Sequence, residues 1–132
     1  MKLSPELHWL ALTVVATILM WVPYVLARVT ARGLFAAMGN PGVNDPPEPP
    51  WADRARRAHA NAVENLAVFA PLVLIAAQLG VTTPATVLAA KTYFWARIAH
   101  YLIYAAGIPV ARTLAFVVGV AATLTFAAAI LL

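Results

Sequence analysis

Apolar residues fill most of the chain in long runs, and polar residues interrupt these runs at intervals. Residues 7–27 contain no Asp, Glu, Lys or Arg, and neither do residues 113–132. A helix of about 20 apolar residues is long enough to cross a bilayer. Further apolar runs lie between these two stretches. The pattern predicts an all-α integral membrane protein, a single four-helix bundle domain over 1–132 with helices at about 6–32, 52–79, 84–106 and 110–131.

One substantial loop interrupts this pattern. Residues 39–50, GNPGVNDPPEPP, are rich in proline, which lacks the amide N–H that a helix interior requires. Shorter turns are predicted at residues 80–84 and at 107–109, where Gly107 closes one helix and Pro109 opens the next. The helices are therefore expected to pack as one compact bundle.

Composition supports a membrane location. Charged residues make up 11% of the chain and hydrophobic residues 63%, whereas a soluble domain carries about 25% charged residues. The formal net charge is +4, but the basic residues flank apolar segments and form no soluble basic face. We therefore expect the lipid bilayer, and not a nucleic acid, as the partner of this surface.

The basic residues also predict an orientation. Most of them lie beside the first and third loops: Arg28, Arg32, Arg54, Arg56, Arg57 and Arg112. Loops on the cytoplasmic side of a membrane carry an excess of Lys and Arg. This rule places the two arginine-rich loops in the cytoplasm and both termini outside it.

Ionisable residues inside the apolar runs are candidates for function, because a charge buried in lipid is costly. Arg57, Asn61 and Glu64 are spaced four and three residues apart, so they share one face of a helix. On the next helix Arg97 and Tyr104 are two turns apart, and Tyr93, His100 and Tyr101 are expected close to the same stripe.

Two such stripes on neighbouring helices would face one another. Guanidinium groups, a carboxylate and a carboxamide suit a small zwitterionic ligand whose carboxylates bind arginine and whose amine binds Glu64. The alternative is structural, with Arg57–Glu64 or Arg97–Glu64 as buried ion pairs that set helix register. Metal and nucleotide motifs are absent from the sequence, and there is no cysteine, so any thiol would come with a ligand.

Residues 57–64, RAHANAVE, match R-A-H-x-N-x-x-E, the signature of the second helix in the MAPEG family (membrane-associated proteins in eicosanoid and glutathione metabolism). Arg97, His100 and Tyr104 resemble the third-helix signature R-x-x-H/Y-x-x-x-Y. Residues 107–113 resemble the turn into the fourth helix, where the family carries an arginine followed by a small hydroxyl residue. The resemblance covers the whole chain.

The resemblance implies a homotrimer with glutathione, as co-substrate, bound between adjacent subunits. The glutathione contacts that it implies are Arg57, Asn61, Glu64, Arg97 and Tyr104, together with Arg28 from the neighbouring subunit. Arg32, one turn further on, competes with Arg28 for the glutathione carboxylate. Arg112 matches the arginine credited with stabilising the thiolate, with Tyr104 as the second catalytic candidate.

The activity expected from this resemblance is that of a membrane glutathione transferase, with peroxidase activity as a further expectation. A guanidinium lowers the pKa of a nearby thiol, and the thiolate then attacks a lipophilic electrophile that enters from the bilayer between the first and fourth helices.

The alternative is a noncatalytic trimeric scaffold that binds lipid or a partner. A transporter is disfavoured because four short helices without an internal repeat leave little room for alternating access. The composition, rich in Ala, Pro and Arg, suggests a bacterial member of the family. With the orientation predicted from the arginines, we expect an inner-membrane protein with periplasmic termini.

Overall fold

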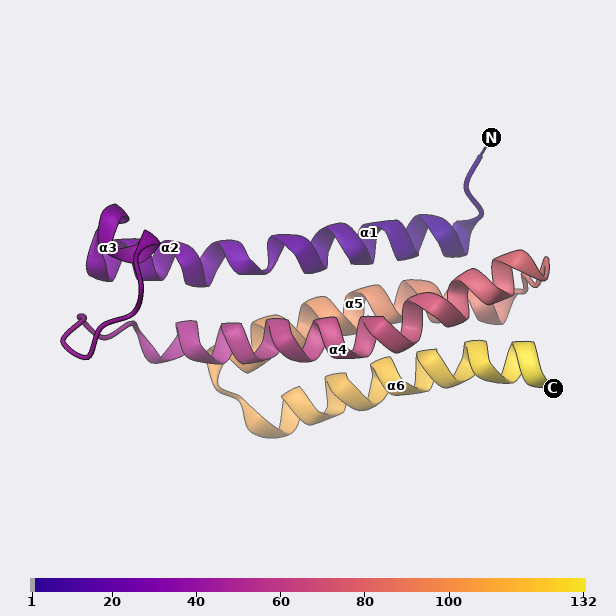
Figure 1. The fold of residues 1–132 in the computed structure, drawn as a ribbon. Coiled ribbons are helices and arrows are strands. Elements are labelled where there is room, and N and C mark those ends of the chain that lie inside the picture. Colours follow the sequence, from indigo (N-terminus) through magenta and orange to yellow (C-terminus); the bar gives the residue numbers. More distant parts are fainter. Residues whose placement is uncertain (1) are drawn as a thin grey trace.

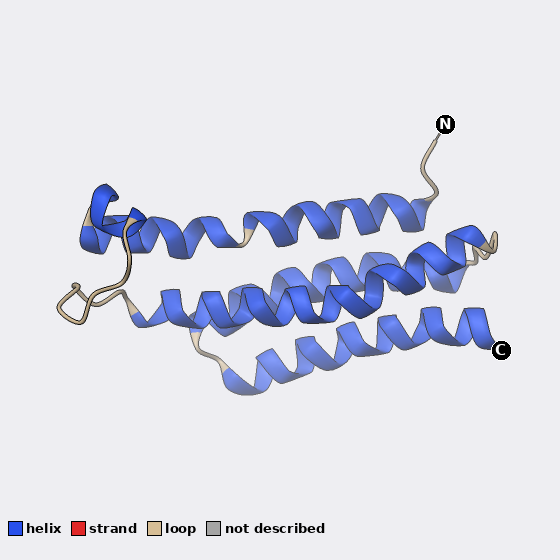
Figure 2. Ribbon diagram, in the orientation of Figure 1, coloured by secondary structure: helices blue, strands red, loops and turns tan. Residues whose placement is uncertain are grey.

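The computed structural model describes residues 2–132, and every regular element in this range is a helix (Figure 2). In chain order the helices are α1 (Pro5–Leu19), α2 (Trp21–Arg32), α3 (Leu34–Met38), α4 (Pro50–Gln78), α5 (Pro84–Ala106) and α6 (Pro109–Leu131). The four helices predicted from the apolar runs therefore correspond, in chain order, to α1 with α2, to α4, to α5 and to α6.

Local sequence explains where several helices begin. The Ser4 hydroxyl accepts a hydrogen bond from the amide of Leu7 and so caps α1. At α5, the Thr83 and Thr86 side chains each accept from the other residue's amide in a capping box. Proline follows the cap in both helices, where its missing N–H costs no hydrogen bond.

The first long helix is divided at Met20, where the sequence predicted one element over 6–32. Pro23 has no amide proton to offer the carbonyl of Leu19 and its ring crowds that carbonyl, so the helical hydrogen bonds are interrupted there. The Tyr101 hydroxyl of α5 donates a 2.8 Å hydrogen bond to the Met20 carbonyl at the break. A further short helix, α3, precedes the proline-rich loop.

The long helices run side by side, and both termini lie at one end of the molecule (Figure 1). The proline-rich loop and the α5–α6 turn lie at the other end. The central position belongs to α5, which packs against α1, α4 and α6. Different faces of α5 therefore contact three other helices. This arrangement brings together polar side chains from distant parts of the sequence.

Two kinds of packing hold α4 and α5 together. Near the middle of the bundle the Phe69 and Tyr93 rings stack with centroids 3.6 Å apart, and Phe126 of α6 meets Phe69 edge-on. Toward the loop end, the fully buried residues of α4 are small: Ala55, Ala58 and Ala62. Small side chains let neighbouring helices approach closely, as is common in membrane bundles.

Within residues 2–132, three helical segments are long and apolar enough to cross a membrane: Pro5–Arg32, Pro50–Gln78 and Pro109–Leu131. Large apolar side chains such as Val15, Ile18 and Leu114 are exposed along them, as expected where lipid is the solvent. The chain is thus an integral membrane protein. Polar residues such as Lys91, Arg97 and His100 lower the hydropathy of α5, and the latter two are buried inside the bundle.

Candidate functional site

A polar pair links α4 and α5 inside the bundle. A terminal guanidinium nitrogen of Arg97 donates a 2.6 Å hydrogen bond to Oδ1 of Asn61, and Asn65 donates to the same oxygen at 3.3 Å. Arg97 is only 3% exposed. Gly119 of α6 packs against it, since a β-carbon there would lie 3.7 Å from the arginine side chain, at ordinary van der Waals contact. The sequence-predicted neighbours Asn61 and Arg97 are therefore in direct contact.

Further polar residues extend from this pair along α5 toward the arginine-rich end of the bundle. Nδ1 of His100 lies 3.4 Å from a guanidinium nitrogen of Arg97, and its ring meets the Tyr104 ring edge-on at 5.6 Å. The guanidinium carbon of Arg112, on α6, lies 4.4 Å from the centre of the Tyr104 ring. Asn61, Arg97, His100, Tyr104 and Arg112 thus form one connected series across α4, α5 and α6, which we call the polar series.

The α5–α6 turn positions the end of this series. Gly107 adopts a φ of +82°, in the left-handed region that glycine tolerates, and it closes α5. Arg54 of α4 packs against this glycine and donates a 3.0 Å hydrogen bond to the Ala105 carbonyl. The chain then reverses, and Arg112, in the first turn of α6, reaches back over Tyr104.

Two of the predicted residues stand apart from the polar series in a single chain. Arg57 is exposed and pairs with Asp53, one turn away, at 2.9 Å. Glu64 is exposed as well, and among residues 2–132 no ion pair includes it. The buried ion pairs considered from the sequence, Arg57–Glu64 and Arg97–Glu64, therefore do not form within one chain.

Arg97 has unused binding capacity. Its Nε is buried and has no hydrogen-bond partner, and none of the described carboxylates pairs with its charge. A buried guanidinium is stabilised when an anion and further hydrogen bonds satisfy its donors. The donor set of Arg97 consequently fits the carboxylate of a small ligand, with Asn61 already holding one side of the guanidinium.

Arg28 and Arg32 lie in a second cluster, around a carboxylate that the sequence did not single out. Glu48, in the proline-rich loop, lies 3.5 Å from Arg28, 3.6 Å from Arg32 and 3.0 Å from Arg56. Burial opposes its ionisation, but the hydrogen bond and charge of Arg56 and the charge of Arg28 outweigh that effect and hold the pKa of Glu48 below its usual value. The loop is thereby tied to α2 and α4.

Sequence spacing misplaced Tyr101. It was expected close to the stripe of Arg97 and Tyr104, but its hydroxyl donates to the Met20 carbonyl on the α1–α2 side of α5. His100 and Tyr101 are neighbours in sequence, and adjacent residues on a helix point about 100° apart. His59, which the sequence did not assign to the site, shares a 2.8 Å hydrogen bond with Tyr24 and so links α4 to α2.

Among residues 2–132, no group of three or more His, Cys, Asp or Glu side chains is arranged to hold a metal ion. The functional groups at hand are guanidinium, carboxamide, phenol, imidazole and one exposed carboxylate. They can bind a carboxylate or amine, and they can stabilise an anion that forms near Arg112. Thiol chemistry would require a thiol from the ligand.

Comparison with known proteins places the chain in a family. Among curated proteins, nothing matches the chain. The family model described as the MAPEG family matches residues 7–132, which includes every residue of the polar series and both arginine-rich loops. A match over nearly the whole chain confirms the resemblance drawn from the helix signatures, and the protein therefore belongs to the MAPEG family.

Proposed function

We propose that this protein is a membrane glutathione transferase that conjugates glutathione to lipophilic electrophiles. The MAPEG family includes glutathione transferases as well as noncatalytic members. One observation carries the proposal: Arg97 is nearly fully buried, its Nε has no hydrogen-bond partner, and among residues 2–132 no carboxylate pairs with it. The carboxylate of Glu64, on the neighbouring helix α4, is exposed. Glutathione offers the complementary groups, two carboxylates and one amine.

Most residues of the polar series, together with Arg57 and Glu64 of α4, have a role in this proposal. Arg97, held by Asn61, binds a glutathione carboxylate through charge-assisted hydrogen bonds. Glu64 accepts the ammonium group, and Arg57 supplies a second guanidinium once the ligand competes with Asp53. Tyr104 contributes a phenol beside the thiol.

Arg112 stabilises the reacting sulfur. A free thiol has a pKa of about 8.5, so only a small fraction is ionised at neutral pH. The guanidinium of Arg112, positioned over Tyr104, favours loss of the thiol proton to solvent. The thiolate donates its electron pair to an electrophilic carbon, a C–S bond forms, and the leaving group departs with the electrons of the broken bond.

The site is incomplete in one chain, and we propose that a homotrimer completes it. Arg57 and Glu64 are exposed charges on α4, a helix that crosses the membrane, where contact with lipid is unfavourable. A neighbouring subunit would cover them and would bring its own arginine-rich end of α2 to the bound ligand. In this arrangement α5 is the fourth membrane-spanning helix and is shielded by α1, α4 and α6.

A second candidate, a noncatalytic trimeric scaffold, is favoured by one specific contact. Arg28 and Arg32, two arginines considered for the glutathione carboxylate, already share Glu48. A scaffold would keep these pairs as structural ties. In a transferase, the ligand carboxylate would have to compete with Glu48 for Arg28.

Glutathione binding and thiolate formation separate the two candidates. Calorimetry on the detergent-purified protein should detect glutathione binding, and native mass spectrometry should show three copies. The bound thiol should ionise at lower pH than free glutathione, as followed by the ultraviolet absorbance of the thiolate. Arg112→Ala should raise the thiol pKa and lower turnover of an aromatic halide, with little change in glutathione affinity. Arg112→Lys should retain part of the lowered thiol pKa and part of the turnover. Absence of glutathione binding, or binding without any thiolate shift, would favour the scaffold.

A further inference from the structure

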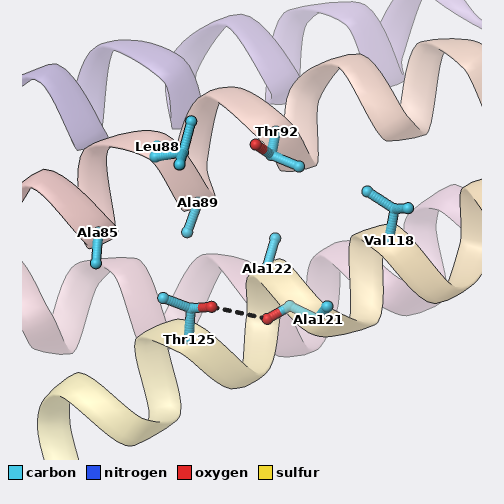
Figure 3. Close-up of a pocket in the computed structure, with 8 residues that line it drawn as sticks. All are labelled: Ala85, Leu88, Ala89, Thr92, Val118, Ala121, Ala122 and Thr125. Carbon is cyan, nitrogen blue, oxygen red and sulfur yellow. Dashed lines mark hydrogen bonds between the residues drawn. The ribbon is translucent and has the colours of Figure 1, made fainter.

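A long apolar groove runs between α5 and α6, on a face that the polar series does not use. It consists of two adjoining cavities of about 330 and 430 Å³, which share Leu88, Thr92 and Val118. Both volumes fall within the range of small-molecule sites, about 300–1,000 Å³. Figure 3 shows one of these cavities, with α5 on one side and α6 on the other. We call it the α5–α6 groove.

The walls of the groove are almost wholly apolar. Small residues such as Ala89 and Ala122 form its floor, and Leu88 and Val118 flank it (Figure 3). The Thr125 hydroxyl is turned away to donate a 2.9 Å hydrogen bond to the Ala121 carbonyl of its own helix. A wall with this chemistry binds hydrocarbon and offers little to a polar ligand.

The groove is also long. Its lining residues on α5 extend from Ala85 to Ala99, which is about 21 Å at 1.5 Å per residue. The residues of the polar series on α5, such as Arg97 and His100, are buried toward the interior of the bundle, whereas Trp95 and Leu88 in the groove are exposed. The groove is therefore separate from the proposed glutathione site.

One charged residue lines this groove. Lys91 is exposed, and among residues 2–132 none of the ion pairs includes it. The carboxylates of the chain lie elsewhere: Asp45, Glu48 and Asp53 pair with arginines at the loop end, Glu6 binds two threonines, and Glu64 is on α4. No side-chain carboxylate of the chain therefore pairs with Lys91, and a counter-charge for it would come from outside the chain.

The position of Lys91 along α5 indicates which kind of molecule could supply the counter-charge. It lies seven residues after Pro84, about 10 Å from the start of α5, and a lysine side chain extends toward the nearer headgroup region. We propose that the α5–α6 groove binds an acyl chain of an anionic phospholipid, whose phosphate pairs with Lys91. One molecule of this class supplies both the hydrocarbon and the negative charge, whereas a helix of a second copy would bury the ammonium in an apolar contact.

Trp95 lies in the groove and serves as the reporter for a test. A variant with Trp9→Phe, Trp21→Phe and Trp51→Phe, which keeps Trp95 as its single tryptophan, is reconstituted in phosphatidylcholine vesicles. Small, equal fractions of phosphatidylglycerol or phosphatidylcholine with brominated acyl chains are then added, and quenching of Trp95 is measured. We expect brominated phosphatidylglycerol to associate about five-fold more strongly than brominated phosphatidylcholine, a preference typical of one lysine at an anionic surface.

Variants test the two parts of the site separately. Lys91→Gln should remove the preference for phosphatidylglycerol and Lys91→Arg should keep it, while Lys2→Gln, an equal charge change outside the groove, should leave it unchanged. Ala99→Leu, which fills the groove, should reduce quenching by both lipids. Equal quenching by the two lipids in the wild type, or an undiminished preference in Lys91→Gln, would overturn the proposal. Shielding of Trp95 from both lipids would overturn it as well, and would mean that another copy of the chain covers the groove.

Discussion

Arg97 on α5 and Asn61 on α4 are joined by a 2.6 Å hydrogen bond, although the arginine is 3% exposed and pairs with no carboxylate among the described residues. A neutral carboxamide thus holds a buried charge in place without neutralising it. This relationship orients the guanidinium and leaves its charge available to an anion. It is the reason that Arg97, of all the basic residues, is the strongest candidate for binding a ligand carboxylate.

Replacing Asn61 by Leu should destabilise the protein in the absence of ligand. The substitution removes the principal acceptor of a buried guanidinium, and such losses typically cost about 2–4 kcal/mol. Thermal unfolding in mild detergent measures the effect. Asn65→Ala is the matched control, since it removes only a donor to Asn61 and should cost much less. Similar losses in both variants would mean that Arg97 does not depend on Asn61.

Glu64→Gln should weaken glutathione binding by roughly ten- to a hundred-fold, because the ligand ammonium loses a charged acceptor. Glu64 is exposed and makes no ion pair within the described chain, so thermal stability without ligand should change little. Calorimetry gives the glutathione affinity, and thermal unfolding of the same preparation gives the stability without ligand. A large loss of stability with normal affinity would instead give Glu64 a purely structural role and contradict its role in binding.

Gly107→Ala should destabilise the α5–α6 turn by about 1–2 kcal/mol. The residue has a φ of +82°, and an added β-carbon would lie 3.3 Å from the guanidinium of Arg54. Gly33→Ala is a matched control, because Gly33 has a φ of +83° with nothing within 4 Å of the added carbon. The difference between the two unfolding temperatures isolates the contact with Arg54, and equal losses would show that only backbone conformation matters.

Glu48→Gln should lower stability at neutral pH by about 1–2 kcal/mol, because one carboxylate binds three arginines. The pKa of Glu48 is lowered in the folded protein, so its contribution is fully present above the unfolded-state pKa, about 4.5, and is lost as the pH falls through the folded value. The wild type and the variant should therefore converge in acid. Asp53→Asn, at a more exposed carboxylate, should show a smaller difference at pH 7. A gap between wild type and Glu48→Gln that stays constant down to low pH would contradict the ionic role.

Reporter fusions at Leu132 should place the C-terminus outside the cytoplasm. Both termini lie at the end opposite the proline-rich loop, and six of the nine Lys and Arg residues are at or near the loop end (Figure 1). The excess of positive charge should keep that end in the cytoplasm. A reporter that works only in the cytoplasm should be inactive at this position, and strong activity would show that the bundle has the reverse orientation.

The sequence was sufficient for features that depend on local chemistry. Apolar runs predicted membrane helices because lipid-facing surfaces need no charge, and Gly107 with Pro109 predicted a turn that the structure contains. Residues 57–64, taken together with Arg97, His100 and Tyr104, led to the correct family because the two signatures combined are specific.

The sequence was not sufficient for contacts between helices. Glu6, near the N-terminus, is 4% exposed and accepts 2.7 Å hydrogen bonds from Thr82 and Thr86, some 80 residues away. The spacing of Arg57 and Glu64 suggested an ion pair, yet Arg57 pairs with Asp53. Periodicity assigns a residue to one side of its own helix, but it contains no information about which neighbouring helix that side meets.

The sequence by itself therefore determined the membrane location, the helical segments and the family, since each depends on composition or on residues within a few turns of one another. Only the tertiary structure decided that Asn61 holds Arg97, that Arg112 lies over Tyr104, and that Glu48 gathers three arginines. These contacts depend on the rotation and crossing of packed helices. Those are set by the fit of small and large side chains across α4, α5 and α6, and not by any single stretch of the chain.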